Sequence, residues 1–540
     1  MRSARYAGRH VAPALCVTEQ LEEACAPVQS FDRLVIAGDP DAEVPEAGYE
    51  KAPVRTVDLA QRIAGRRPEP ESAACTGDLG IRLGDVRSGK HTLQEFLAQM
   101  RDEELLPIVR GEGMCSPKVT PGVAAAFGGV TQTLQNYGIP TGACSDGPSG
   151  IRMDSGAMAF SSPSGTAIAC SFNTMLTSQL YEYVGRELRM NHIDSLLGPG
   201  INIHRNPLNG RNFEYFSEDP YLTGMMASAE LLAMHRSKTT GTIKHFACNN
   251  QETRRSRANP VVSERALREI YLKPFEMTVK QGGARLIMTT YGPLNDIWTA
   301  GNYDLNTTIL RRQWHYTGAV MTDWWAEMSD DAGVCARTLT AQMIRAQNDL
   351  YMVVNDALQG MEGDNAAEGL ASGLITRGEL LRNAANICRV LLELPAMEFF
   401  EGEEDEIEER NRPQTKEGRM YTQPAAVCGQ GGAELDVSGL VTEAGSSNLY
   451  SVTIPARGAC RMRFAVSSAL DALAQVSVSV YVNNTIQGSF TVNGTGGEVV
   501  EREIEFNSLL QIDNFVKIYF AQSGLEVHSI RLTQQPAVPG

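Results

Sequence analysis

Three short apolar segments decide the fold: GTIKHFA (residues 241–247), RLIMTTYG (285–292) and GAVMTDWW (318–325). Each has the length of a strand and ends abruptly in polar or aromatic residues. Comparable runs occur before and after them, GIPTGACSD (138–146), IDSLLGPG (193–200) and DLYMVVND (349–356), separated by stretches with helical periodicity such as SERALREIYLKPFEMTVKQ (263–281). This α/β alternation predicts a parallel sheet, and roughly 300 residues of it fit a (β/α)8 barrel of the TIM type.

Composition divides the rest of the chain. Residues 1–92 hold one strand-like run, RLVIAGDP (33–40), and a stretch rich in Pro and Arg, so we interpret them as the remnant of an α/β domain. The barrel is expected over 93–400. Residues 401–429 begin with EGEEDEIEERNR and are predicted to be an acidic linker rather than an acidic catalytic loop. From 430 to 540, runs such as CRMRFAVSS (460–468) and QVSVSVYVNN (475–484) alternate with period two, which predicts an antiparallel β-sandwich.

Charge and cysteine content exclude several classes of protein. With 48 Lys and Arg against 64 Asp and Glu, the net charge is −16, which argues against partners such as nucleic acid or a membrane surface. No apolar run approaches the roughly 20 residues of a membrane-spanning helix, and the basic N-terminus has no apolar core typical of a signal peptide. The 11 cysteines form no CxxC pair, which predicts reduced thiols, no metal site and a cytoplasmic location.

The polar residues at the ends of the predicted strands are candidates for a site. Reactive groups of a (β/α)8 barrel lie at the carboxyl ends of its strands. The candidates are Asp146 after GACS, Arg211 and Glu214 in GRNFEYFSEDP, Lys244 and His245 after GTI, Tyr291 after LIMTT, and Asp323 after GAVMT, with Trp324 and Trp325 beside it. Charged groups with aromatic faces on one rim suit a sugar, which offers many hydroxyls and an apolar face.

Each candidate also has a purely structural explanation. Asp323 is a suitable helix N-cap, Lys244 and His245 suit a buried ion pair and a core histidine, and Met288 fits a core position. Asp146 lies within SDGPSG, whose glycines are more typical of a tight turn than of a ligand cradle. The occurrence of all these residues at strand ends of one predicted barrel favours a site.

Five motifs carry a resemblance to a known family. SDGPSGIR (145–152), GPGINIHRNPLNGRNFEYFSEDP (198–220), TIKHFACNNQE (242–252), MTTYGPLND (288–296) and GAVMTDWW (318–325) resemble, in order and separation, the barrel of glycoside hydrolase family 3, the β-glucosidase and β-xylosidase family. The similarity spans about residues 95 to 400. The tail from about 430 looks like the extra β-sandwich of domain-permuted bacterial members.

The resemblance implies a role for each matching residue. Asp323 matches the nucleophile, and Asp146, Arg152, Arg211, Lys244 and His245 match residues that bind the sugar in the −1 subsite. Met288 matches a pocket wall, Tyr291 a tyrosine near the nucleophile, and Trp324 a tryptophan on the leaving-group side. A retaining glycosidase needs an ionised nucleophile, and we expect Arg211 and Lys244 to keep Asp323 deprotonated. No cofactor is implied.

The second carboxyl group of a retaining mechanism, the general acid/base, is missing from the motifs. Family members take it from an α/β-sandwich domain or use a His-Asp dyad, and the loop ACNNQETRRSR (247–257) lacks that dyad. Glu252, Glu112 and the acids of 401–409 are poorly supported candidates, and a second chain is an alternative source. The general acid/base therefore stays unassigned.

Three hypotheses follow. The first is a retaining, exo-acting β-glycosidase, with β-glucosidase preferred, acting on a small carbohydrate substrate. The second is a catalytically impaired family member that binds carbohydrate. The third makes the β-sandwich a carbohydrate-binding module, but its aromatic residues mostly alternate as a core would: Phe464, Tyr481, Phe490, Phe515, Tyr519 and Phe520. We expect the β-sandwich to pack against the barrel and shape the leaving-group side of the pocket. The sequence does not decide whether the sugar is glucose, xylose or arabinose, which linkage is preferred, or whether the chain forms a homo-oligomer.

Overall fold

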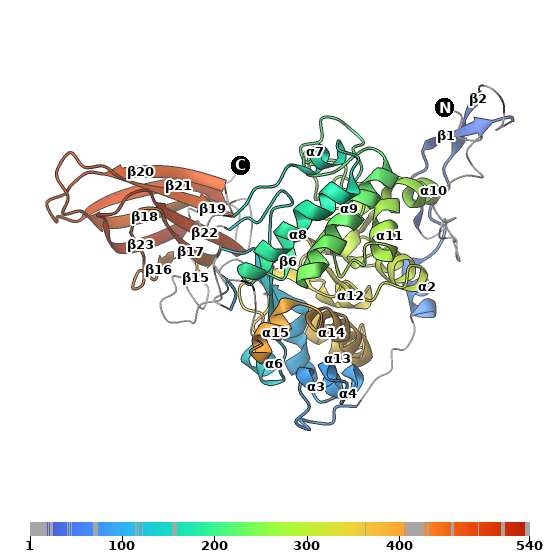
Figure 1. The fold of residues 1–540 in the computed structure, drawn as a ribbon, viewed down its shortest axis with the longest axis horizontal. Helices are drawn as coiled ribbons and strands as arrows, with labels where there is room; N and C mark the ends of the chain where they lie inside the picture. The colour runs from blue at the N-terminus through green and yellow to red at the C-terminus, as the bar shows by residue number, and fades with distance from the viewer. Residues whose placement is uncertain are drawn as a thin grey trace.

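A computed structural model shows two bodies of secondary structure, a mixed helical and stranded body and a purely stranded one formed by the C-terminal residues (Figure 1). It describes residues 19, 21, 25–39, 42, 44, 46–67, 74–113, 116, 118–120, 122–153, 159–361, 363–403, 407, 426–428, 431–454, 458–483, 485–508 and 513–534. Most of the predicted acidic linker lies outside the described residues. No helix in the described ranges combines the length and apolarity needed to cross a membrane.

An eight-stranded sheet, here called the barrel sheet, organises the first body. Its strands run in the order β11-β8-β7-β6-β5-β4-β3-β14, and a parallel bridge between Met321 and Leu350 joins the two ends of the sheet. The strands are β3 (Arg110–Glu112), β4 (Ala125–Gly128), β5 (Thr141–Ser145), β6 (Ser195–Leu196), β7 (Thr240–Phe246), β8 (Leu286–Thr289), β11 (Ala319–Met321) and β14 (Tyr351–Val354). The six runs expected to be strands coincide with β5, β6, β7, β8, β11 and β14.

One strand departs from the predicted parallel sheet. β4 runs antiparallel to both β3 and β5, whereas the other neighbouring pairs are parallel. Parallel neighbours need a crossover of about a dozen residues or more, usually through a substantial helix. The connection from β4 to β5 contains only the short helix α6 (Gln132–Asn136), which suits an antiparallel return.

Helices cover the barrel sheet, and α8, α9 and α11 lie alongside one another (Figure 1). Local sequence explains their ends: Asp219 caps α9 ahead of Pro220, and Thr376 and Glu379 form a capping box on α14. Besides α6, the α-helices of this body are α3 (Leu83–Arg87), α4 (Leu93–Ala98), α5 (Asp102–Leu105), α7 (Gly165–Ala169), α8 (Thr174–Met190), α9 (Pro220–Met234), α10 (Glu264–Ala266), α11 (Lys273–Lys280), α12 (Thr340–Arg345), α13 (Ala366–Ser372), α14 (Arg377–Leu391) and α15 (Pro395–Glu401).

A buried ion pair closes the barrel sheet. The carboxylate of Asp349, which is fully buried, accepts hydrogen bonds from Arg311 (2.6 Å), from the backbone N–H of Val320 in β11 (2.8 Å) and from Asn386 (2.9 Å). Val320 belongs to the strand that leads to Asp323, and Asp349 immediately precedes Leu350 of the closing bridge. The pair therefore fixes the start of the strand that carries the candidate nucleophile.

An Asp349→Ala substitution is expected to destabilise the protein by about 3–5 kcal/mol, because it leaves the Arg311 guanidinium buried without its anion. The free energy of unfolding, measured by urea denaturation, checks this. Glu269→Ala is the matched control, because it removes only an exposed pair with Arg265 and should leave the stability nearly unchanged. Equal stability of the two variants would contradict the role of the buried pair.

The second body consists of two sheets, here called the C-terminal sheets. One has the order β15-β17-β22-β19-β20 and the other β16-β23-β18-β21, and residues of both share one apolar core. The strands are β15 (Ala426–Val427), β16 (Ala433–Leu435), β17 (Ser446–Thr453), β18 (Gly458–Ser467), β19 (Val476–Val482), β20 (Thr485–Val492), β21 (Val500–Ser508), β22 (Asp513–Phe520) and β23 (Glu526–Gln534).

The aromatic residues of these sheets only partly follow the predicted core pattern. Phe464 and Phe520 are fully buried between the sheets, and Phe490 packs against them. Phe515 is also buried, but it belongs to the apolar cluster of the barrel sheet instead. Strand β22 places the Phe515 ring on the face that points away from the core between the C-terminal sheets, where it contacts the body that contains the barrel sheet.

The N-terminal segment forms an antiparallel hairpin of β1 (Asp32–Ala37) and β2 (Glu46–Lys51), followed by α2 (Leu59–Arg66). Arg62 pairs with Asp304 at 2.9 Å, and Val28 N–H donates to Asp296 at 2.9 Å. Asp296 lies in the hairpin of β9 (Pro293–Leu294) and β10 (Ile297–Trp298), which the smaller hairpin of β12 (Met328–Ser329) and β13 (Cys335–Ala336) adjoins.

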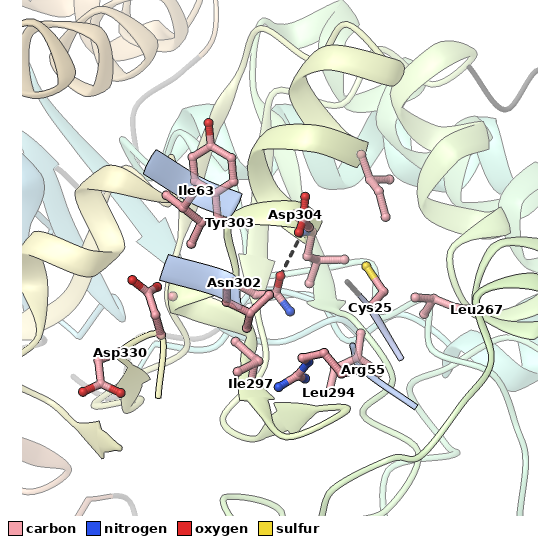
Figure 2. Close-up of a pocket in the computed structure, with 15 residues that line it drawn as sticks. Cys25, Arg55, Ile63, Leu267, Leu294, Ile297, Asn302, Tyr303, Asp304 and Asp330 are labelled. Carbon is pink, nitrogen blue, oxygen red and sulfur yellow. Dashed lines mark hydrogen bonds between the residues drawn. The ribbon is translucent and has the colours of Figure 1, made fainter. Parts of the chain in front are cut away.

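A cavity lies where this segment meets the barrel body, with Cys25, Arg55 and Ile63 close to Leu294 and Tyr303 (Figure 2). Its volume is about 30 Å³, roughly the volume that one water molecule occupies in liquid water. This cavity is therefore too small for a sugar.

Candidate functional site

The predicted site residues gather in a cavity of about 310 Å³, within the usual range of small-molecule sites. Strands β7 and β8 near their carboxyl ends, and the loops that follow β5, β6, β7, β8 and β11, supply them, as expected for a barrel. The lining includes every residue to which the resemblance gave a role: Asp146, Arg152, Arg211, Lys244, His245, Met288, Tyr291, Asp323 and Trp324. It also includes Trp325, which the sequence placed beside Asp323, and two polar residues that were not predicted, Arg255 and Asn483, whereas the candidate Glu214 lies outside the lining.

Asp323 has one carboxylate oxygen bound and one free. Its Oδ1 accepts the backbone N–H of Trp324 at 2.8 Å. Its Oδ2 is buried, accepts no hydrogen bond from the described residues, and lies 3.6 Å from Nε2 of His245. The described residues therefore leave this oxygen available to a ligand in the cavity.

Burial and charge act in opposite directions on Asp323. Burial raises the pKa of its carboxyl above the usual range, and the cations of Arg255, Arg211 and Lys244 together with the Trp324 N–H lower it without cancelling the rise. We expected Arg211 and Lys244 to keep this group ionised, and both do act in that direction. The larger cationic influence is Arg255, and the net shift of the Asp323 pKa is upward because burial outweighs these cations.

A network of charged groups occupies the side of the cavity at β5 and β7. Nζ of Lys244 lies 3.5 Å from Oδ1 of Asp146 and 3.8 Å from Oε2 of Glu214, and Arg152 lies 3.5 Å from the other oxygen of Asp146. Burial alone would raise the pKa of Asp146, but Lys244, Arg152 and the Gly147 N–H lower it below the ordinary value. Asp146 is therefore an ionised acceptor, and Glu214 pairs with Arg211.

His245 is held as a neutral ring. Asn202 bonds both its backbone N–H and its backbone carbonyl, each at 2.9 Å, and the Tyr215 hydroxyl lies 3.2 Å from its Nδ1. Burial, followed by the charges of Arg211 and Lys244, lowers the pKa of the imidazole well below its usual range. Its Nε2 faces Asp323 and the cavity, so the ring can exchange a hydrogen bond with a ligand hydroxyl.

Arg255 and Tyr291 form a stacked pair beside Asp323. The guanidinium carbon of Arg255 lies 4.1 Å from the centre of the Tyr291 ring, a cation–π geometry. Burial and the charge of Asp323 raise the pKa of the Tyr291 hydroxyl, which keeps it a hydrogen-bond donor. Arg255 lies in the loop NNQETRRSR, where three arginines share one segment and no spacing distinguishes them.

The general acid/base candidates lie elsewhere. Among the described residues that line the cavity, the only carboxylates are Asp146 and Asp323. Glu252 is bound by Arg255 and Asn249, each at 2.9 Å, and lines an adjoining hollow of about 1,180 Å³. Glu112 accepts bonds from Ser116 (2.8 Å), Lys118 (2.6 Å) and the Ala357 N–H (3.2 Å), which indicates a structural role.

The described acids of 401–409, Glu401 and Glu403, do not line the cavity; both pair with Arg87 of α3. The remaining acids of this segment lie outside the described residues. The described lining thus combines one free carboxylate, cations and aromatic faces, and it suits a polyhydroxylated ligand.

Comparison with known proteins identifies the family. The model of the glycosyl hydrolase family 3 N-terminal domain matches residues 108–390, which is more than half of the chain. The chain therefore belongs to glycoside hydrolase family 3. Among curated proteins, a β-glucosidase from Ruminococcus albus is 47% identical over 531 residues, which covers 98% of this chain and 55% of that protein.

Solved structures agree with the family. A β-glucosidase from Paenibacillus barengoltzii superposes with a TM-score of 0.69 at 45% identity, over 95% of this chain and 55% of that one. β-Glucosidase 3B from Thermotoga neapolitana, in complex with glucose, has a TM-score of 0.52 at 33% identity, over 57% of this chain and 44% of that one. The chain spans about half the length of these relatives, and the match covers the barrel sheet and its site.

Proposed function

We propose that the protein is a retaining, exo-acting β-glucosidase in which Asp323 attacks the anomeric carbon of a terminal sugar. The observation that carries this proposal is the free Oδ2 of Asp323, buried and aimed at a cavity that cations and aromatic rings surround. A retaining glycosidase needs such an unencumbered carboxylate to form a covalent glycosyl–enzyme. The β-glucosidases at 47% and 45% identity support glucose as the sugar.

The other groups of the cavity would hold the sugar. Asp146 accepts hydrogen bonds from ring hydroxyls, while Arg152, Arg211 and Lys244 donate them, and such charged contacts discriminate strongly because a missing hydroxyl leaves a buried charge unpaired. Neutral His245 bonds a further hydroxyl. Tyr291 and Arg255 lie beside Asp323, where they would stabilise the charge that changes during attack.

The general acid/base is left unassigned within this proposal, because no free carboxylate besides Asp323 lines the described cavity. Without acid assistance, the rate depends on how readily the leaving group departs with its negative charge. We therefore expect glucosides with activated aryl leaving groups to react faster than disaccharides.

The finer architecture forms part of the proposal. We interpret the barrel sheet and its helices as a (β/α)8-type domain over 93–400 with one reversed strand, and the C-terminal sheets as a β-sandwich over 430–540. The shared core of the two C-terminal sheets and the helices around the barrel sheet support this division. A cytoplasmic location remains the prediction from cysteine usage.

The stereochemical course of hydrolysis tests the proposal. With 2,4-dinitrophenyl β-glucoside as substrate, proton NMR of the first product should show β-glucose before mutarotation. Release of α-glucose would contradict retention, and absence of any turnover would favour the carbohydrate-binding alternative. The corresponding xyloside and arabinoside, compared by kcat/KM, report on the preference for glucose.

In an Arg255→Met variant, we expect the low-pH fall in the rate of Asp323 labelling, here called the acid limb, to begin at a higher pH. Asp323 must be ionised to attack, so the rate of its labelling by a 2-deoxy-2-fluoroglucosyl fluoride falls as pH falls through its pKa. Arg255 is the largest cationic influence that lowers this pKa, so its removal raises the pKa further and the loss begins at a higher pH.

The matched control for this pH profile is Arg257→Met. Arg257 lies two residues along the same loop and pairs with Glu327 outside the cavity lining. Its removal should leave the acid limb in place. An acid limb that stays fixed or moves to lower pH in Arg255→Met would contradict the electrostatic assignment.

A further inference from the structure

The C-terminal sheets contact the barrel rim on three adjacent loops. Phe515 of β22 stacks on Trp325, with ring centres 5.5 Å apart, and presses on Gly113 after β3 so closely that no Cβ would fit there. Asn355, which follows β14, bonds Ser451 and Thr453 of β17. The strands β3, β14 and β11 are neighbours in the closed sheet, so the contact covers one continuous part of the rim.

This contact brings Asn483 into the cavity that holds Asp323. Asn483 follows β19 at the turn to β20 and adopts the left-handed backbone conformation, with φ of +48°. Its N–H donates to the Phe515 carbonyl and its Oδ1 accepts the Phe515 N–H, both at 2.9 Å, while its Nδ2 donates to Asn514 at 3.0 Å. These bonds tie the turn to the strand that carries the buried Phe515, so the side chain forms a fixed wall.

The order of the strands in the barrel sheet indicates where a bound sugar would lie relative to Asn483. In the closed ring of eight strands, β5, which leads to Asp146, lies diametrically opposite β11, which leads to Asp323. A sugar whose outer hydroxyls bind Asp146 and Lys244 presents its anomeric carbon to Asp323. Asp323 attacks from the face of the sugar opposite the bond that breaks, and an equatorial aglycone extends away from the hydroxyls held at β5. The lining on that side, away from Asp146, is where Trp325 and Asn483 can meet the aglycone.

We propose that the turn at Asn483, with Trp325, forms the leaving-group subsite and that Asn483 selects substrates by the size of the aglycone. This inference rests on the proposed function, because a leaving-group subsite requires glycosyl transfer to Asp323. The partly exposed Trp325 supplies an aromatic face for the aglycone, and Asn483, which bonds the Phe515 that contacts Trp325, limits the space in the same cavity. The C-terminal sheets are then a part of the substrate pocket.

Two labelling reagents that need little acid assistance separate the subsites. The fluoride of 2-deoxy-2-fluoro-β-glucose leaves as a single atom, whereas the 2,4-dinitrophenyl ether of the same sugar places an aromatic ring in the leaving-group subsite. The ratio of their inactivation rates, dinitrophenyl over fluoride, therefore reports on that subsite alone. Intact mass of the full chain over time gives both rates.

Two variants keep the left-handed backbone, since glycine and histidine tolerate it better than most residues. Asn483→His enlarges the wall and should lower the ratio about tenfold, whereas Asn483→Gly opens the space and should raise it about threefold. Ile486→Ala, on the same hairpin and exposed, is the matched control and should leave the ratio unchanged. Labelling by the fluoride also shows that each variant is folded.

Each outcome decides between the claims. Opposite shifts in the two Asn483 variants with an unchanged Ile486→Ala ratio support the inference. A parent chain that both reagents label, together with ratios that stay equal in all variants, contradicts the inference and leaves the proposed function intact. A parent chain that neither reagent labels overturns the proposed function and the inference with it.

Discussion

An Asp323→Asn variant is expected to lose turnover of 2,4-dinitrophenyl β-glucoside by about 10⁴-fold or more, because an amide cannot form the glycosyl–enzyme bond. Folding should change little. Oδ1 of Asp323 only accepts the Trp324 N–H, a bond that an asparagine carbonyl reproduces, and Oδ2 has no donor among the described residues to lose. Initial rates and thermal unfolding of the same preparation separate catalysis from stability.

Asp330→Asn, in the turn of the β12–β13 hairpin that follows, provides the matched control. Asp330 accepts the backbone N–H groups of Ala332 and Val334 at 3.0 and 2.9 Å, much as Asp323 accepts that of Trp324. It lies outside the lining of the cavity that holds Asp323, so its amide variant should keep the parent rate. An Asp323→Asn variant as active as this control would remove Asp323 as the nucleophile.

A Lys244→Met variant is expected to lower kcat/KM about 100- to 1,000-fold, with KM raised and kcat lowered together. Lys244 is almost fully buried beside Asp146 and Glu214, and removal of a donor that acts on the reacting substrate typically lowers the rate about 100- to 1,000-fold. Methionine keeps most of the volume and removes the charge. Steady-state kinetics with the activated aryl glucoside measure the effect.

Lys280→Met removes an exposed lysine from α11 and serves as the control, because Lys280 pairs only with Glu276 on the same helix. Its kinetics should match those of the parent. Parent-like kinetics in Lys244→Met as well would contradict the contact between Lys244 and the sugar. A fall in kcat with unchanged KM would point instead to an action on Asp323 alone.

The sequence predicted the site well where strand periodicity and polar strand ends coincide. Lys244 and Asp323 each interrupt an apolar run at the point where a barrel strand ends, so their convergence follows from the fold. The reversed direction of β4 escaped prediction because a run such as AAFG carries no information on strand direction. Arg255 escaped because it lies in a loop whose path depends on packing rather than on periodicity.

The contribution of the C-terminal sheets illustrates a second limit. From the sequence pattern, Asn483 is an ordinary turn residue after an alternating strand, and Phe515 is one of several expected core positions of the C-terminal sheets. Only the docking of the two bodies brings Phe515 against Trp325 and Asn483 into the cavity. The sequence did predict that these sheets pack on the barrel, but the contact surface depends on tertiary packing.

The central claim is that Asp323 is a live retaining nucleophile in a pocket that accepts glucose. Incubation of the pure chain with 2-deoxy-2-fluoro-β-glucosyl fluoride, followed by intact mass and peptide mapping, tests it most directly, because the activated leaving group bypasses the unassigned acid. We predict one stable adduct, located on the peptide that contains Asp323. An adduct on another carboxylate, or no adduct with this reagent and its xylosyl analogue, would contradict the claim.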